Sequence, residues 1–185
     1  MAVTATDTTA IKLGGVTQII LTPYADGSKG STSYSLDNIV ADTTSITQED
    51  PTTNTVDCET RDEPIFENIT LGRYTFSAES GDIQDIVLTN CFGFTKGASG
   101  SLYAPSVYKE IWAEIEVVFG DKGSLVCPKV KMSGNIDASS LKTGMVRGVI
   151  SGSCYSVSIT TEATGSGSTT TPLTTPFYYK APAGD

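Results

Sequence analysis

The sequence predicts a mainly β fold, a two-sheet β-sandwich or half-barrel with one flanking helix and a long polar arm. Hydrophobic residues make up 38% of the 185 residues and charged residues 18%, a composition too apolar for wholesale disorder. Short, alternating β-branched runs recur along nearly the whole chain, as expected for strands. One segment alone shows the 3–4 spacing of a helix.

The first half of the chain carries several strand patterns. Residues 16–22 form a β-branched run that Pro23 and the Asp26-Gly27 turn signal close. Residues 31–40 and 43–60 are polar and threonine-rich, so they should pair as strands only where another segment covers them. Residues 69–78 predict a strand with a break or bulge at Gly72.

The helical pattern follows this strand. Ser80 suits an N-cap, and Asp82 and Asp85 suit the positive end of the helix dipole. Gly93 ends a run of about three turns. The expected stripe of 3–4 spacing, which should pack on a sheet, consists of Ile83, Ile86, Val87 and Asn90-Cys91.

Residues 107–119 form the clearest strand, because polar and apolar side chains alternate along its whole length. Residues 120–123 should turn it into a second strand over 124–132, making a long hairpin. The expected core face carries Val107, Ile111, Ile115, Val117 and Phe119. Residues 145–161, bent at Gly148 and Gly152, and residues 176–180 are the last expected strands. We therefore expect one domain over residues 1–162, and a Gly/Ser/Thr-rich linker with a C-terminal edge segment over 163–185.

The composition excludes much enzyme chemistry. The chain has no histidine, which rules out catalytic triads and metal sites that depend on histidine. Glu114 and Glu116 lie on one strand face roughly 7 Å apart, near the spacing of glycosidase carboxylates, but a solvated acidic face is far commoner. No phosphate loop or spaced calcium ligands occur. We expect no enzymatic activity and no cofactor.

The cysteines and the N-terminus indicate where the protein resides. Cys58, Cys91, Cys127 and Cys154 lie far apart without a CxxC pair, so we expect reduced, mostly buried thiols. No signal peptide and no membrane span are visible, which favours a protein made and kept in the cytosol without membrane contact.

Acidic residues are concentrated in the first half of the chain. Residues 1–95 carry 4 basic and 14 acidic side chains, and residues 96–185 carry 8 and 7, which gives the net charge of -9. The densest block, residues 42–67, is either a solvated loop or an arm that pairs with a neighbouring subunit. We favour an assembly arm over about 42–64, with candidate residues Thr44, Ile46, Glu49, Asp50, Thr53 and Val56.

Several segments, in order, resemble the tail tube proteins of long-tailed bacteriophages. They are residues 47–52, 58–65 and 72–77, and the acidic helix over 82–91 that ends at Phe92-Gly93-Phe94. The resemblance implies a self-assembling virion protein that forms stacked, hexameric rings around a channel for DNA ejection. It implies a location in the virion tail after assembly in the host cytoplasm.

The same resemblance implies the partners and the candidate lumen residues. The partners would be copies of the chain and the tape-measure, terminator and baseplate proteins, with DNA passing without adhesion. An acidic wall suits such passage because it repels phosphates. The candidate lumen or ring-interface residues are Asp57, Glu59, Asp62, Glu63, Glu110, Glu114 and Glu116.

Three other classes remain open. A secretion-system tube protein would share the fold and the ring. An exported fimbrial or adhesin-like subunit would also be threonine-rich and β-sheet, but should carry a signal peptide. An enzyme or a carbohydrate-binding module is disfavoured by the absence of histidine and the single tryptophan.

Overall fold

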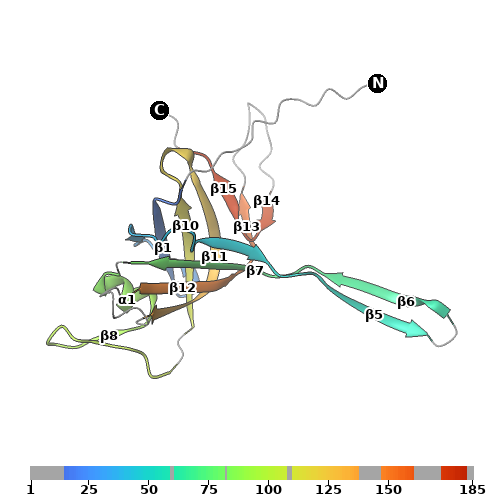
Figure 1. Cartoon of the computed structure of the whole chain (residues 1–185), viewed down its shortest axis with the longest axis horizontal. Coiled ribbons are helices and arrows are strands. Elements are labelled where there is room, and N and C mark those ends of the chain that lie inside the picture. The colour runs from blue at the N-terminus through green and yellow to red at the C-terminus, as the bar shows by residue number, and fades with distance from the viewer. Residues whose placement is uncertain are drawn as a thin grey trace.

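The computed structural model describes residues 15–58, 61–81, 83–107, 110–137, 147–160 and 172–182, with the backbone alone for 56–58, 61–65 and 137. The predicted mainly β fold with one flanking helix is confirmed for this part of the chain. A nine-stranded antiparallel sheet dominates it, and three two-stranded hairpins and the helix α1 (Asp85–Cys91) complete it (Figure 1).

The main sheet has a simple order of strands. Its central path is β2 (Ser28–Lys29), β1 (Gln18–Ala25), β10 (Ile111–Val118), β11 (Ser124–Asp137), β12 (Arg147–Cys154), β7 (Tyr74–Ser80) and β4 (Ser45–Gln48). Two further strands pair off this path: β3 (Tyr34–Leu36) with β1, and β15 (Tyr178–Lys180) with β11.

Strand β11 joins the two halves of the sheet. One edge pairs with β10, and its other edge pairs first with β15, through residues 124–126, and then with β12, through residues 130–137. The register against β10 shifts between Ala113 and Ile115, and such an irregularity bends a strand. In Figure 1, β1 and β10 consequently cross the direction of β7 and β12, so the two halves of one sheet enclose a common core.

The core is apolar and draws on both halves. Its largest fully buried side chains include Ile19, Leu21, Phe76, Ile115, Met132 and Ile150. Each such side chain contributes about 1.5–3 kcal/mol when it leaves water. Helix α1 covers this core with Val87, Leu88 and Cys91.

Two glycines let the helical segment approach the sheet closely. A Cβ at Gly134 of β11 would overlap the ring of Phe92, and a Cβ at Gly148 of β12 would overlap the side chain of Ile83. Gly148 therefore does not bend the chain as predicted. It lies within the continuous strand β12 and leaves room for the side chain of Ile83.

The predicted start of the helix is wrong. Ser80 is the buried last residue of β7, paired with Gly148, so the strand ladder occupies the residue expected to cap the helix. The helix begins after Gln84, which makes no side-chain capping bond. Its apolar stripe includes Leu88 and Cys91, while Ile86 is 49% exposed. Asp82 lies outside the described residues.

The predicted hairpin is correct in its core face and wrong at its ends. Ala113, Ile115 and Val117 are buried, but β10 begins only at Ile111, and Val107 is 75% exposed. Phe119 precedes the short 3-10 turn Gly120–Lys122 and is partly buried against the core. The second strand runs on to Asp137 because β12 pairs with that extension. Strand β1 likewise continues through Pro23, still in register with Ala113.

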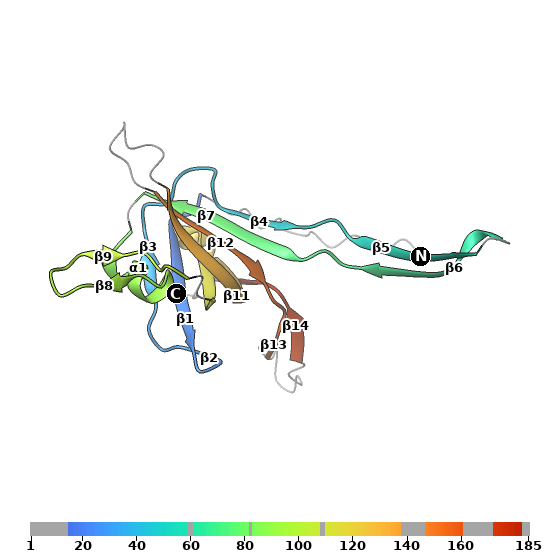
Figure 2. The same cartoon turned by 90° about the horizontal axis from the view of Figure 1, so that it is seen from below.

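The polar segment in the first half folds as a long hairpin. Strands β5 (Thr52–Cys58) and β6 (Arg61–Thr70) pair with each other and project far from the core (Figures 1 and 2). Smaller hairpins join β8 (Thr95–Lys96) to β9 (Leu102–Tyr103), and β13 (Val157–Thr160) to β14 (Pro172–Thr175). Strand β14 falls in the expected linker, whose residues 163–171 lie outside the described part.

We predict that Ile115→Asp yields no soluble, folded protein. A carboxylate without a partner in the core costs several kcal/mol, against a total stability of about 5–15 kcal/mol. Val107→Asp is the matched control, because this exposed residue comes from the same alternating run. Soluble yield and thermal unfolding measure both variants. Normal melting of Ile115→Asp would show that the core face is assigned to the wrong side of β10.

Candidate assembly surfaces and the polar face of the sheet

The β5–β6 hairpin, hereafter the arm, leaves the sheet at a tightly packed junction. The amide of Glu49 donates to the carbonyl of Arg73 at 2.9 Å, closing the ladder between β4 and β7. A Cβ at Gly72 would overlap the backbone carbonyl oxygen of Glu49. The break predicted at Gly72 is therefore the point where two strands of the sheet pass into the two strands of the arm.

The predicted arm residues divide between the sheet and the arm. Ile46 lies in β4, packs against the core and pairs with Phe76 of β7, and Thr44 directly precedes that strand. Neither residue lies in the arm, which begins near Thr52 and not near residue 42 as expected. Glu49 and Asp50 are exposed at the junction, and Thr53 is exposed on β5. Val56 lies on β5, where the backbone alone is described.

The arm exposes apolar side chains that the domain does not cover. Phe66 and Ile69 of β6 are 56% and 59% exposed, and Leu71 at the junction is 77% exposed. Phe66 and Ile69 point to opposite faces, because successive residues of a strand alternate. Each face of this two-stranded arm is therefore open to a partner, and an isolated two-stranded hairpin is only marginally stable in water.

Glu114 and Glu116 of β10, and Glu110 directly before that strand, do not form an uncompensated acidic surface. Glu114 pairs with Lys29 at 2.6 Å, Glu116 with Lys180 at 3.0 Å, and Glu110 with Lys131 at 2.8 Å. Their lysines come from β2, β15 and β11, neighbours that the alternating pattern of β10 alone could not identify. These ion pairs reduce the local charge, and the placement of the three glutamates at a lumen or ring interface stays a prediction. The side chains of Asp57, Asp62 and Glu63 are not among those described, and Glu59 lies outside the described residues.

The environment of Glu116 favours its ionised form. Burial alone would raise its pKa, but the hydrogen bonds from Ser124 at 2.6 Å and from Lys180 outweigh burial and lower it. The same bond raises the pKa of Lys180. For Glu110, the hydrogen bond from Lys131, followed by that from Trp112, lowers the pKa.

The exposed face of the sheet carries rows of hydroxyl groups across adjacent strands. Residues aligned in register form two rows, Ser133–Ser151–Ser77–Ser45 and Ser153–Thr75–Thr47. Within them Ser45 and Ser77 are bonded at 3.0 Å, and Thr47 and Thr75 at 2.9 Å. These rows could not be predicted from the sequence, because the pairing of four distant segments creates them. The abundance of serine and threonine was the available signal.

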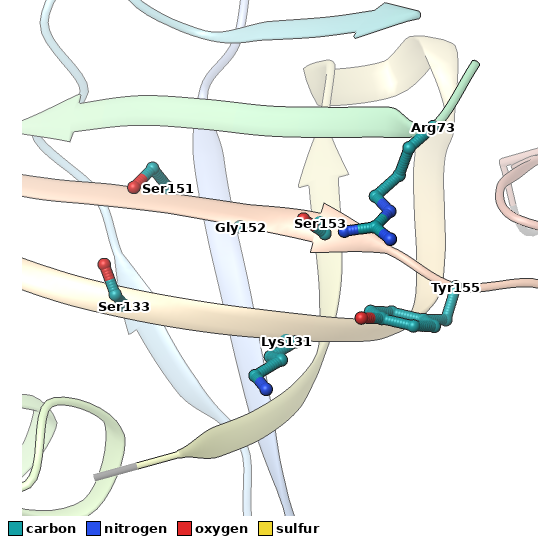
Figure 3. A pocket seen from close by; sticks show the side chains of 7 residues that line it. All are labelled: Arg73, Lys131, Ser133, Ser151, Gly152, Ser153 and Tyr155. Carbon is teal, nitrogen blue, oxygen red and sulfur yellow. The ribbon is translucent and has the colours of Figure 1, made fainter. Parts of the chain in front are cut away.

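A shallow hollow of about 360 Å³ opens on this face (Figure 3). We call it the Arg73 hollow, and its lining consists of Arg73, Lys131, Ser133, Ser151, Gly152, Ser153 and Tyr155. Beside it, Trp112 packs edge-on against Tyr155 with ring centroids 5.0 Å apart, and the amino group of Lys129 lies 4.9 Å from the Trp112 ring. The sequence predicts a bend at Gly152 and includes Arg73 in the segment 72–77 of the resemblance, but it indicates a binding role for none of these residues.

The cysteines agree with the prediction where the structure describes them. Cys91, Cys127 and Cys154 are free and buried, and Cys58 is described by its backbone alone. Burial raises the pKa of Cys91 to about 12. A hydrogen bond to Cys154, together with burial, raises the pKa of Cys127. These two core residues therefore remain protonated at neutral pH.

Comparison with known proteins adds no relatives: no family model, curated protein or solved structure matches the chain. Within the described residues, no group of three or more cysteine, aspartate or glutamate side chains is placed to hold a metal ion. No helix among those residues is long and apolar enough to cross a membrane.

We predict that Glu116→Gln destabilises the protein in a pH-dependent way. The pKa of Glu116 is lowered in the folded state, so its contribution is present above its ordinary pKa of 4.5 and is lost as the pH falls through the folded value. We expect a loss of about 1 kcal/mol at pH 7, discounted for partial exposure, and a progressively smaller loss as the pH falls below 4.5. Urea unfolding across this range measures it, and a pH-independent difference would contradict the assignment.

Proposed function

We propose that the chain is a structural subunit that assembles with copies of itself into a tube of stacked rings, as in the tail tube proteins of long-tailed phages. The arm is the observation that carries this proposal. It extends away from the core, it pairs only with itself in the described part of the chain, and it exposes apolar residues on both faces. A monomer gains nothing from such an arm, whereas a neighbouring subunit would cover it.

The edge of the sheet next to the arm supports the same function. Strand β4 pairs with β7 on one side, and among the described residues no strand pairs with its other side. An open edge beside a projecting hairpin offers backbone donors and acceptors to a second copy of the chain. Ring closure would satisfy these groups without a new fold.

The overall charge suits passage of DNA through such a tube. The net charge of -9 repels phosphates, and most of the excess lies in the first half of the chain. Because lysines compensate the glutamates of β10, the acidic field must come from other carboxylates, including those of the arm. In this proposal the arm, which holds four of the seven candidate lumen residues, carries most of the uncompensated negative charge.

We predict that removing the arm abolishes tube formation and leaves a folded subunit. Thr52 and Thr70 are paired, so an Asn-Gly turn can replace residues 52–70 without straining the sheet. Thermal melting should report an intact core, and electron microscopy and sedimentation should show no rings or tubes. If the shortened chain still builds tubes, the arm is not the assembly element.

We further predict that Phe66→Ser, Ile69→Ser and Leu71→Ser together weaken assembly without lowering the stability of the subunit. Burying one such side chain is worth about 1.5 kcal/mol or more, so the critical concentration should rise roughly tenfold or more. The matched control replaces Tyr103, Val107 and Leu173 by serine, since these are equally exposed apolar residues outside the arm. Equal effects from both triple variants would contradict a specific arm contact.

Wild-type assembly should strengthen with ionic strength. Stacking acidic subunits brings like charges together, and salt shortens the Debye length from about 30 Å at 0.01 M to about 8 Å at 0.15 M. Sedimentation across this range measures the effect. A chain that stays monomeric at every salt and protein concentration would refute the proposed function.

A further inference from the structure

We propose that the Arg73 hollow binds a small acidic sugar, one that carries a carboxylate or phosphate group on a polyhydroxylated ring. This inference goes beyond assembly, because the hollow lies on the domain and not on the arm. Its volume of about 360 Å³ falls at the lower end of the range for ligand sites, which suits a ligand of monosaccharide size. Most of its lining comes from β11 and β12, which pair with each other in the main sheet.

Arg73 supplies the charge that would bind the acidic group. It reaches from the start of β7 across Ser153 toward Tyr155 (Figure 3), and its guanidinium lies 5.7 Å from the centre of the Tyr155 ring. No ion pair occupies Arg73 in the described part of the chain. A guanidinium without a carboxylate partner offers a planar pair of N–H donors that matches a carboxylate or a phosphate. Lys131 adds positive charge at the rim while it remains bonded to Glu110.

The hydroxyl groups would bind the rest of the ring. Ser133, Ser151 and Ser153 line the hollow, and their side-chain hydroxyls make no hydrogen bond to another described residue. Ser133 and Ser151 stand opposite each other in register, away from Arg73 in Figure 3. A hydroxyl both donates and accepts, as the hydroxyls of a sugar do. The hollow therefore presents an anion-binding end and a polyol-binding end.

A nucleic acid fits the same surface less well. Its bases would need free aromatic faces for stacking, but Tyr155 already contacts Arg73 and Trp112, and Lys129 lies over Trp112. The net charge of -9 also opposes a long polyanion, while a single acidic group meets mainly the local field of Arg73. The observations therefore favour a small ligand.

Titration of the full-length chain tests this proposal at 0.15 M salt. The probes are glucuronate and glucose 6-phosphate, with glucose, inorganic phosphate and a short oligothymidylate as comparisons. The single tryptophan, Trp112, touches Tyr155 and should report binding by fluorescence, and the backbone amides of Ser151, Ser153 and Tyr155 should shift in NMR spectra. We expect both acidic sugars to saturate the hollow with dissociation constants in the millimolar range. Glucose alone and phosphate alone should bind much more weakly.

Variants separate the two ends of the hollow. Arg73→Gln should weaken the binding of the acidic sugars roughly tenfold, as loss of a charged hydrogen bond does. Arg73→Lys should keep part of this affinity, because it retains the positive charge. Ser151→Ala should weaken them roughly threefold without affecting folding, because this side chain is exposed. The matched control is Lys96→Gln, an exposed lysine that pairs with Asp85 outside the hollow and should change nothing.

Four outcomes would overturn the proposal. They are no saturation by either acidic sugar, equal binding of glucose, equal binding of inorganic phosphate, and tighter binding of the oligothymidylate at the same amides. A chain that forms no tubes but binds glucuronate through Arg73 would refute the proposed assembly and leave this site standing. A chain that forms tubes but binds neither acidic sugar would refute this site and leave the proposed assembly standing.

Discussion

The pairing of β11 along both edges is the constraint on which the rest of the structure depends. This strand holds β10 and β1 on one side and β15, then β12, on the other, so it links every strand of the main sheet. Its irregular register near Ala113 lets the two halves turn toward each other, and their apolar faces then meet in one core. The close approach of Phe92 to Gly134 places the helical segment against this same strand.

The arm differs from the main sheet, because it projects away from the core (Figure 1). Pairing within the hairpin satisfies the backbone groups on the inner edges of β5 and β6, while the groups on their outer edges stay open to a partner. Pairing alone leaves Phe66, Ile69 and Leu71 in water, and their burial is the free energy that an assembly could gain. The two strands of the arm therefore pair with each other, and in the proposed assembly a neighbouring subunit would cover its apolar side chains. The sequence alone predicts pairing of this segment with a neighbouring subunit and does not predict the hairpin.

Local patterns in the sequence predicted what depends on local residues. The alternation around Ile115, the break at Gly72 and the existence of one helix could all be predicted, because strand period and glycine conformation act over a few residues. The helix start could not, since Ser80 is held by a strand that follows it by nearly seventy residues. The same limit applies to Glu114 and Glu116. Their lysine partners lie on β2 and β15, at the two ends of the chain, so spacing along β10 left them unpaired.

The exposed face of the sheet follows from these distant pairings as well. Lysines from β2 and β15 pair with the glutamates of β10, so the charges there cancel locally. The alignment of β11, β12, β7 and β4 places the hydroxyl groups of neighbouring strands side by side. Against this nearly neutral background Arg73 is conspicuous, because its guanidinium contacts an aromatic ring and no carboxylate of the described chain. A cation held this way keeps its charge available for a ligand, since a ring partner binds one face of the guanidinium and leaves its N–H groups directed outward. In the proposed site this single position would decide which small anion the hollow holds, while the negative net charge of the chain opposes a long polyanion.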